Sequence, residues 1–253
     1  MFSRALLKKP CRALVDGLST AGLGVPDHEK ALRQHAAYAD ALRACGLELT
    51  VLDADENFPD SVFIEDTAVL SETMAVITRP GAPSRRGEER AVAEALAGFY
   101  GRLEHITAPG TLEGGDVLRA EDHFYIGISA RTNEEGARQL AAILARNGYA
   151  STRVPLRHVL HLKTGIAYLQ ENLLLAHGEF VGHPLLAGFK TVPVPAAEGY
   201  AANSLWINGR VLVPAGFPLA RKTVSRAGYE TVSVDVSEFR KLDGGLSCLS
   251  LRF

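Results

Sequence analysis

The sequence has few cysteines and no surplus of basic residues. Its three cysteines, Cys11, Cys45 and Cys248, include no CxxC pair, so we predict reduced thiols and no disulfide framework or structural zinc site. The 27 lysines and arginines face 29 aspartates and glutamates, which gives a formal net charge of −2. This balance lacks the basic excess of proteins that bind phosphate backbones, so we expect no nucleic-acid partner.

Long apolar runs are absent from the sequence as well. No window approaches the ~18–20 apolar residues of a membrane span, so we expect no membrane partner. The basic start of the sequence holds only the short apolar run Ala5–Leu7, which is far too short for the core of a secretory signal. We therefore expect a cytoplasmic location. A length of 253 residues with a hydrophobic fraction of 47% predicts an ordinary globular chain with one domain over residues 1–253.

A strand-like pattern recurs five times along the chain. Each copy begins with a short β-branched or alternating run, which is typical of a strand, and continues into a polar turn. The predicted first strands are residues 48–54, 102–108, 152–156, 190–195 and 230–236, and the turns are residues 59–66, 109–116, 158–165, 198–203 and 239–248. Most copies then contain two more strand-like runs around a loop. Apolar residues at helical spacing predict helices over 28–46, 88–101 and 130–148, with shorter candidates at 180–189 and 218–228.

These repeats predict an α/β fold. A single unit cannot bury its own apolar face, and a closed ring removes the unpaired strand edges of a linear array. We therefore predict a five-bladed α/β propeller with pseudo-fivefold ββαβ repeats, and an open mixed α/β sheet is the alternative. In a ring, equivalent turns lie at one end of the central axis. Residues that are distant in sequence would then converge.

The five turns carry residues suited to thiol chemistry. A catalytic cysteine needs an imidazole that moves protons and a third group that orients the imidazole, and such residues are usually distant in sequence. In chain order, the turns supply Asp60, Glu65 and Asp66; Glu113 and Asp116; His161; Asn203; and Asp243 with Cys248. The residues alone therefore predict a nucleophile, a base and several carboxylates at one site.

Structural roles are the alternatives for these residues. Acids and glycines in turns form Asx-type hydrogen bonds, and a lone cysteine is usually a buried small hydrophobe, as we expect of Cys11 and Cys45. His161 follows the apolar alternation VLHL, so a hydrogen-bonded core histidine is a real alternative. A zinc site built from His158, His161 and Cys248 is another, although the rest of a ligand set is not evident.

The surplus of carboxylates indicates a cationic substrate. Nearby anions suppress a thiolate, so this site is suited to thiol chemistry chiefly when a bound cation offsets them. A guanidinium is planar, permanently charged and matched to paired carboxylate oxygens. Arg85 precedes one predicted helix and Arg131 opens another, where a basic side chain is disfavoured unless an anion binds it. Surface arginines are the alternative, but together these residues favour an arginine-like amino acid.

Eight blocks distributed over the whole chain carry a further signal. They are LVDGL (14–18), FPDSVFIED (58–66), TRPGAPSRRGE (78–88), TLEGGD (111–116), ISARTNEEGARQL (128–140), HLKTG (161–165), YAAN (200–203) and KLDGGLSCLSLRF (241–253). Together they resemble the dimethylarginine dimethylaminohydrolase family of the guanidino-group-modifying, or pentein, superfamily, whereas EGGD alone would indicate only the superfamily. The resemblance implies a propeller that hydrolyses Nω-methylated arginines to citrulline and an amine through a covalent thiouronium. It implies a small-molecule substrate and no cofactor or metal.

The matching motifs also imply a role for each candidate residue. Cys248 would be the nucleophile, His161 the general acid and base, and Glu113 the partner of His161. Asp66 would hold the guanidinium, the Leu18 carbonyl and Asp60 would bind the α-amino group, Arg85 and Arg131 would bind the α-carboxylate, and Phe63, Glu65 and Asp243 would complete the site. The oligomeric state stays open between a monomer and a homodimer.

Two other functions occur within this superfamily. Arginine deiminases typically have an Arg-Asp pair where this chain has Glu65-Asp66, and an acid two residues after the histidine where this chain has Lys163. Loss of that acid leaves one guanidinium nitrogen without a carboxylate, so an alkylated nitrogen can lie there at lower desolvation cost. We therefore predict methylated arginine as the substrate, with arginine deimination as the alternative. A non-catalytic binding protein, the remaining alternative, would have no reason to keep the thiol, the imidazole and the acids together.

Overall fold

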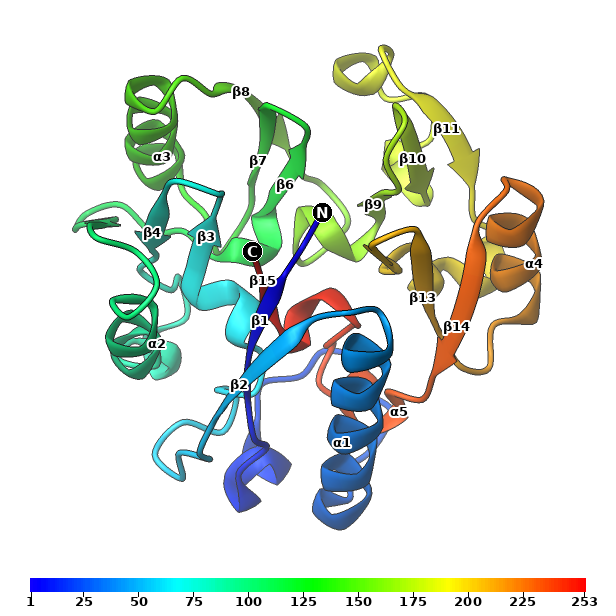
Figure 1. Cartoon of the computed structure of the whole chain (residues 1–253), viewed down its shortest axis with the longest axis horizontal. Coiled ribbons are helices and arrows are strands. Elements are labelled where there is room, and N and C mark those ends of the chain that lie inside the picture. The colour runs from blue at the N-terminus through cyan, green and yellow to red at the C-terminus, as the bar shows by residue number, and fades with distance from the viewer. The chain divides into compact units, whose positions relative to one another are not determined.

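The computed structural model describes all 253 residues, which form two compact units. Unit 1 comprises Met1–Ile64 and Val194–Phe253, and unit 2 comprises Glu65–Pro193. Both units are built from three-stranded sheets, two in unit 1 and three in unit 2 (Figure 1). A single domain over residues 1–253 stays a prediction. No helix combines the length and the apolar character that crossing a bilayer requires.

All five sheets share one topology. In the sheet of β6 (Val117–Ala120), β7 (His123–Ile128) and β8 (Ala150–Pro155), the middle strand pairs antiparallel with β6 and parallel with β8. A parallel pair needs a long crossover, because the chain must return to the end from which it started. Here the crossover is α3 (Glu134–Arg146), which contacts β7 and β8. The predicted repeat of strand, strand, helix and strand is confirmed for this sheet.

Unit 2 contains two further sheets of this kind. Their strands are β3 (Ala68–Leu70), β4 (Ala75–Ile77) and β5 (Leu103–His105), then β9 (Ile166–Tyr168), β10 (Leu173–Ala176) and β11 (Lys190–Pro193). The first crossover contains α2 (Glu89–Leu96). The second was expected to be a helix over 180–189, which is wrong: only the 3-10 turns η6 (Gly178–Phe180) and η7 (Pro184–Leu186) form. Gly182 has a φ of 73° and precedes Pro184, so the chain cannot continue as an α-helix there.

Unit 1 contains the remaining two sheets. Their strands are β12 (Leu205–Ile207), β13 (Arg210–Pro214) and β14 (Glu230–Val234), then β15 (Leu251–Arg252), β1 (Arg4–Lys8) and β2 (Glu48–Leu52). The crossovers contain α4 (Pro218–Arg226) and α1 (His28–Ala44), and α5 (Ser237–Arg240) follows β14. Both ends of the chain contribute to the last sheet, because β1 pairs antiparallel with β15 and parallel with β2.

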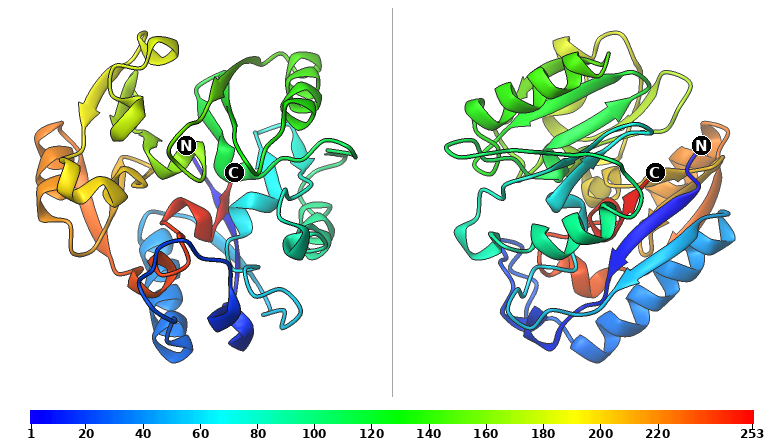
Figure 2. Two further views of the ribbon diagram at one scale, coloured as in Figure 1. Left: turned by 180° about the vertical axis from the view of Figure 1, so that it is seen from behind. Right: turned by 60° about the vertical axis from the view of Figure 1, so that its left-hand side comes forward.

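The longest helix, α1, follows directly from its sequence. Its first turn is capped by Asp27, whose carboxylate accepts the N–H of Lys30 at 2.8 Å. It ends before Gly46, which has a φ of 90° that favours glycine. One face buries Ala31, Tyr38 and Leu42 in the apolar core of unit 1. The right-hand view of Figure 2 shows α1 running alongside β1 and β2.

A short 3-10 turn precedes the first strand of every sheet. These turns are η2 (Ile64–Thr67), η4 (Gly114–Asp116), η5 (Leu162–Thr164), η8 (Ala196–Ala202) and η9 (Ser247–Leu249). A polar residue singled out in the sequence lies in or next to each: Glu65 and Asp66, Glu113, His161, Asn203 and Cys248. The repeat therefore places the candidate residues in or beside equivalent turns of their sheets.

Candidate active site

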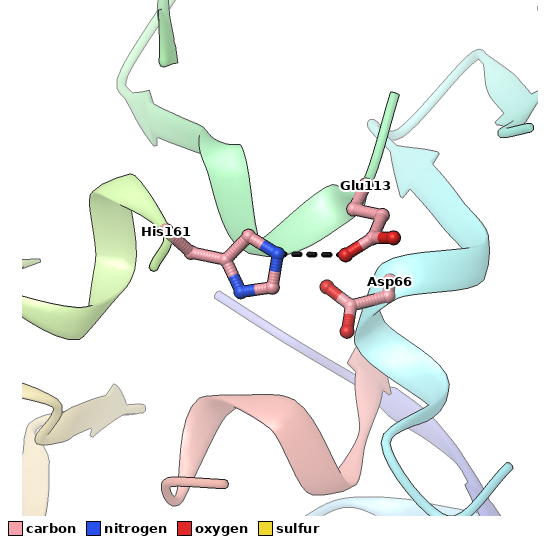
Figure 3. Close-up of side chains that lie close together, drawn as sticks. All are labelled: Asp66, Glu113 and His161. Carbon is pink, nitrogen blue, oxygen red and sulfur yellow. Dashed lines mark hydrogen bonds and ion pairs between the residues drawn. The ribbon is translucent and has the colours of Figure 1, made fainter. Parts of the chain in front are cut away.

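An imidazole and two carboxylates form the centre of the candidate site in unit 2. His161 Nε2 lies 2.7 Å from Glu113 Oε2, and Asp66 lies beside this pair (Figure 3). All three side chains are buried. The arrangement depends on Gly115, where a Cβ would lie 2.9 Å from both Asp66 Oδ1 and His161 Nδ1, and on Gly114, where a Cβ would collide with the backbone of η2. The two glycines of the EGGD block therefore let the three turns approach one another.

The two carboxylates are themselves held by arginines and backbone groups. Asp66 accepts the Gly115 N–H at 2.9 Å and forms an ion pair with Arg85 at 2.6 Å. Arg85 is buried and also pairs with Glu88 at 2.8 Å. Burial opposes the charge of this guanidinium, but Asp66 and Glu88 outweigh that effect and raise its pKa well above the usual value. The alternative of a solvated surface arginine is therefore wrong for Arg85.

Arg131 contacts Glu113 and does not begin a helix. The helix predicted near residue 132 starts only at Glu134, with Asn133 as its N-cap, so the argument from an unfavourable helix terminus is wrong for Arg131. Its guanidinium instead lies 3.2 Å from Glu113 Oε1. The two arginines predicted to meet an α-carboxylate thus lie at the acidic centre, each bound to one of its carboxylates.

The charges of His161 and Glu113 support each other. Burial alone lowers the pKa of His161, because a charged ring loses its hydration, but Asp66, Glu113 and Asp116 outweigh burial and raise this pKa to about 9. Burial alone raises the pKa of Glu113, but His161, Arg85 and Arg131 outweigh it and lower the pKa well below the usual range. The site therefore contains a charged imidazole beside an ionised carboxylate at neutral pH.

A structural role is confirmed for Asp116. Its carboxylate accepts the N–H of Leu162 at 3.0 Å and the hydroxyl of Ser129 at 2.7 Å, so it joins η4 to η5. Burial raises the pKa of this buried carboxyl group. Asp66, Glu113 and His161 have donor atoms within 4.8 Å of one another, a spacing at which a metal ion could bind. These three residues differ from the alternative zinc site of His158, His161 and Cys248. In that alternative, the side chain of His158 is exposed.

Lys163 is a residue whose contact the sequence did not predict. Its Nζ lies 2.7 Å from Glu65 Oε1, and both side chains are largely buried. The resemblance implied only that Glu65 helps to complete the site. The ion pair shows that a lysine two residues after His161 reaches an acid in the turn η2. The only sequence signal for this contact was that Lys163 lies two residues after His161 in the HLKTG block.

Cys248 lies in unit 1, in the turn η9. Its Sγ accepts the N–H of Gly245 at 3.4 Å, and the residue is partly exposed. Cys11 and Cys45 are buried, and burial raises the pKa of each of these two thiols. The buried position predicted for them is confirmed. The convergence of Cys248 with His161 stays a prediction.

Two of the other candidates of unit 1, Asp60 and Asp243, bind the segment 17–24. Asp60 accepts the Leu18 N–H at 3.0 Å, and Asp243 accepts the Thr20 N–H at 2.6 Å. Phe63 packs its ring on Gly244, where a Cβ would collide with it. The resemblance implies that the Leu18 carbonyl and Asp60 bind a ligand, and the structure bonds Asp60 to the backbone N–H of Leu18, not to its carbonyl. Their roles toward a substrate stay predictions.

Comparison with known proteins shows the family of this chain. A family model described as "N,N dimethylarginine dimethylhydrolase, eukaryotic" matches residues 26–179. The N(G),N(G)-dimethylarginine dimethylaminohydrolase of Pseudomonas aeruginosa is 53% identical over 100% of both chains, and that of Streptomyces coelicolor is 39% identical over 98% of this chain and 96% of the relative.

Solved structures agree with the fold as well. A Pseudomonas aeruginosa structure, a cysteine-to-serine mutant complexed with citrulline, matches with a TM-score of 0.99 at 53% identity over 100% of both chains. The N-terminal domain of ArgZ, a cyanobacterial arginine dihydrolase, matches with a TM-score of 0.89 at 20% identity, covering 100% of this chain and 97% of that chain, and supports the fold alone. With five sheets of one topology, the fold class is the mixed α/β pentein fold with a pseudo-fivefold repeat. The chain belongs to the dimethylarginine dimethylaminohydrolase family.

Proposed function

We propose that this chain hydrolyses Nω-methyl- and Nω,Nω-dimethyl-L-arginine to L-citrulline and methylamine or dimethylamine. The observation that carries the proposal is the buried His161–Glu113 pair with Asp66 beside it. The Pseudomonas and Streptomyces relatives are named for this activity, and a Pseudomonas structure contains citrulline. The enzyme is accordingly a hydrolase of a small molecule.

In the first half of the proposed reaction, the Cys248 thiolate forms a bond to the guanidinium carbon. The bond between that carbon and the alkylated nitrogen breaks as the protonated His161 gives its proton to the departing amine. Because the pKa of His161 is raised to about 9, the ring holds this proton at neutral pH. The product is dimethylamine or methylamine, together with a thiouronium on Cys248. Proton donation of this kind accelerates reactions by about 10²–10⁴.

In the second half, His161 is neutral and accepts a proton from water while the water oxygen attacks the thiouronium carbon. The bond between carbon and sulfur then breaks as the second proton of the water passes to the solvent, which releases citrulline and the Cys248 thiolate. His161 is protonated again, so the cycle returns to its starting state. Glu113, bonded to the ring at 2.7 Å, stabilises the imidazolium and fixes the orientation of the ring.

The carboxylates and arginines of the site define the substrate contacts that we propose. Asp66 holds the guanidinium, the Leu18 carbonyl and Asp60 bind the α-amino group, Arg85 and Arg131 bind the α-carboxylate, and Phe63, Glu65 and Asp243 complete the site. The buried ion pairs of Asp66 with Arg85 and of Glu113 with Arg131 favour such an exchange of partners. A zwitterionic amino acid with a guanidinium offers both a cation and an anion, so it can replace each partner of such a pair.

The contact of Lys163 supports methylated arginine over arginine as the substrate. The lysine already binds Glu65 at 2.7 Å, so Glu65 offers less of its charge to a guanidinium nitrogen. An unmethylated nitrogen would lose hydrogen bonds to water on entering, whereas a dimethylated nitrogen has no hydrogens to satisfy. Arginine deimination is the alternative that this contact disfavours.

Product analysis tests the proposed function. Dimethylarginine, monomethylarginine and arginine are incubated separately with the enzyme, and citrulline and the released amine are measured. We expect citrulline with dimethylamine or methylamine from the methylated substrates. Faster ammonia release from arginine would replace the proposal by deimination, and no citrulline from any of the three would end it.

The Cys248→Ser variant tests the nucleophile. It should bind dimethylarginine with nearly the wild-type Kd, because the side chains proposed to bind the substrate are unchanged, while citrulline formation falls to background. Isothermal titration calorimetry and a citrulline assay give the two numbers. Wild-type turnover in this variant would rule out Cys248.

The wider setting of the enzyme is also part of the proposal. We infer that it acts in the cytoplasm, because reduced thiols suit that compartment. A homodimer is the oligomeric state to test, by light scattering of the purified chain. A monomer at all concentrations would refute the dimer without affecting the activity.

A further inference from the structure

One of the five equivalent turns has no part in the proposed reaction. Asn203 directly follows the turn η8 and, like Asp66, Glu113, His161 and Cys248, lies in or next to the 3-10 turn before the first strand of a sheet. Asn203 is buried, although an amide side chain normally remains exposed unless it has partners. Its partners therefore show what it does.

Both ends of the Asn203 amide bind the residue before Cys248. The oxygen Oδ1 accepts the backbone N–H of Ser247 at 2.9 Å, and Nδ2 donates to the Ser247 hydroxyl at 2.9 Å. The amide also packs on Gly245, because a Cβ at that position would collide with Asn203. Asn203 thus holds the turn 244–248 at two points.

Tyr200, from the same turn η8, binds the other end of this segment. Its hydroxyl donates to the Gly244 carbonyl at 2.7 Å. The Gly244 carbonyl and the Gly245 N–H belong to one peptide unit, so this bond fixes the plane of that unit. The Gly245 N–H points at Cys248 Sγ, at 3.4 Å. A hydrogen-bond donor in this position favours the charged form of a thiol.

We propose that Asn203, assisted by Tyr200, is a positioning residue that holds the Gly245 N–H against Cys248 and so stabilises the thiolate. An asparagine suits this place because it accepts from a backbone N–H and donates to a hydroxyl at the same time. An aspartate would add an anion beside the thiolate and oppose its formation. The catalytic consequence rests on the proposed function, whereas the effect on the thiol does not.

Three charged residues of unit 1 lie near this turn, and none of them is substituted in the experiment. Arg252 donates to the Ser247 carbonyl at 3.0 Å, and Arg240 lies 4.9 Å from the centre of the Tyr200 ring. Asp243 precedes the turn and binds Thr20. None of these residues is changed in the variants below, so a difference between variants reports the hydrogen bonds of Asn203 and Tyr200.

The test is alkylation of Cys248 by iodoacetamide as a function of pH, followed by peptide mass spectrometry, with Cys11 and Cys45 as internal references. In Asn203→Ala we expect alkylation about tenfold slower than wild type near pH 7, because a hydrogen bond that favours a charged group is lost. Well above the thiol pKa, both proteins should react at the same rate. For dimethylarginine, kcat should fall with little change in KM.

Asn208→Ala is the matched control. Asn208 also binds backbone groups of unit 1, accepting from the Phe2 N–H at 2.9 Å and donating to the Phe2 and Cys45 carbonyls at 2.8 and 3.0 Å. Its loss should lower the Tm without changing the pH profile of Cys248 alkylation. If Asn203→Ala behaves in the same way, with a lower Tm and an unchanged profile, Asn203 is only structural and the proposal fails.

Two milder variants keep the test decisive if Asn203→Ala does not fold. Tyr200→Phe removes only the bond to Gly244 and should slow alkylation about two- to threefold near pH 7. Ser247→Ala keeps the backbone N–H bond to Asn203 and should react within about twofold of wild type. A Tyr200→Phe profile identical to wild type would overturn the proposal. Differences in alkylation without any hydrolysis of dimethylarginine would refute the proposed function alone.

Discussion

The protonation of His161 is the residue-scale property on which the proposed chemistry depends. The ring is buried, yet three carboxylates keep its pKa near 9, so the site holds its proton before the substrate arrives. A cation entering beside Asp66 competes for the same negative charge and lowers the pKa of the ring. Binding of a guanidinium would therefore prepare His161 to release the proton at the moment when the amine needs it.

Replacement of Glu113 by Gln tests this account. The carboxylate that accepts from His161 at 2.7 Å becomes neutral, so the pKa of His161 should fall by about one unit or more, given 1.36 kcal/mol per unit. Because donation to the amine needs the imidazolium, kcat should begin to fall at lower pH than in wild type. NMR titration of the imidazole and a pH–rate profile measure both effects. Glu104→Gln, which alters a carboxylate bound to Arg102 and Arg146, should change neither; an unchanged His161 pKa in Glu113→Gln contradicts the account.

Lys163→Met tests the origin of selectivity at the same scale. The change leaves Glu65 buried without the lysine, so unfolding should become easier by about 3 kcal/mol. The uncompensated carboxylate should then accept an unmethylated guanidinium nitrogen, and the ratio of kcat/KM for arginine to that for dimethylarginine should rise. Lys163→Arg keeps the cation and should keep the wild-type ratio. Equal ratios in all three proteins would show that Lys163 does not set the preference.

At the scale of elements, the equivalent 3-10 turns explain what sequence analysis could find. Each turn follows a periodic strand and carries glycines or acids, so local patterns located the strands, most of the crossovers and the candidate residues. The strand β2 was predicted as residues 48–54, but the pairing of β1 with β2 and β15 was not, because pairing between the chain ends leaves no local pattern and Ala5–Leu7 is short. The ion-pair partners of Arg85 and Lys163 were not predicted either, because they depend on which turns face one another.

Asn133 connects an element to the site and supports a prediction. Its side-chain oxygen accepts from the Gly136 N–H at 2.8 Å, which caps α3, and from the Thr111 N–H at 3.0 Å, two residues before Glu113. Asn133→Ala should lower the free energy of unfolding by about 1–2 kcal/mol and also reduce kcat, because the loop that carries Glu113 loosens. Asn147→Ala, at the other end of α3, should cost less than about 1 kcal/mol and leave kcat unchanged. Chemical denaturation and steady-state kinetics distinguish them; unchanged kcat in both variants would show that the cap does not support the site.

At the scale of the whole molecule, two buried histidines give stability opposite dependences on pH. Burial lowers the pKa of His35 from 6.5 to about 4, whereas the carboxylates around His161 raise its pKa to about 9. The contribution of His35 is complete above about pH 6.5 and is lost as the pH falls toward 4. That of His161 is complete below about pH 6.5 and is lost as the pH rises through 9. His35 belongs to unit 1 and His161 to unit 2, so each change can be assigned to one unit.

We therefore predict that the free energy of unfolding has a maximum near pH 6.5, the value of both histidines in the unfolded chain. Between about pH 6.5 and 5 it should fall by on the order of 2 kcal/mol, since 1.36 kcal/mol corresponds to one unit of pKa difference. In His35→Gln, the fall in the free energy of unfolding between pH 6.5 and 5 should be much smaller. The part that is left is due to His123, because burial also lowers its pKa. His161→Gln should flatten the alkaline limb alone, and the exposed His105→Gln should change neither. Urea unfolding across this pH range measures both limbs. A full acidic limb in His35→Gln would mean that other groups produce it, because no neutral side chain at position 35 can bind the proton that the unfolded imidazole takes up.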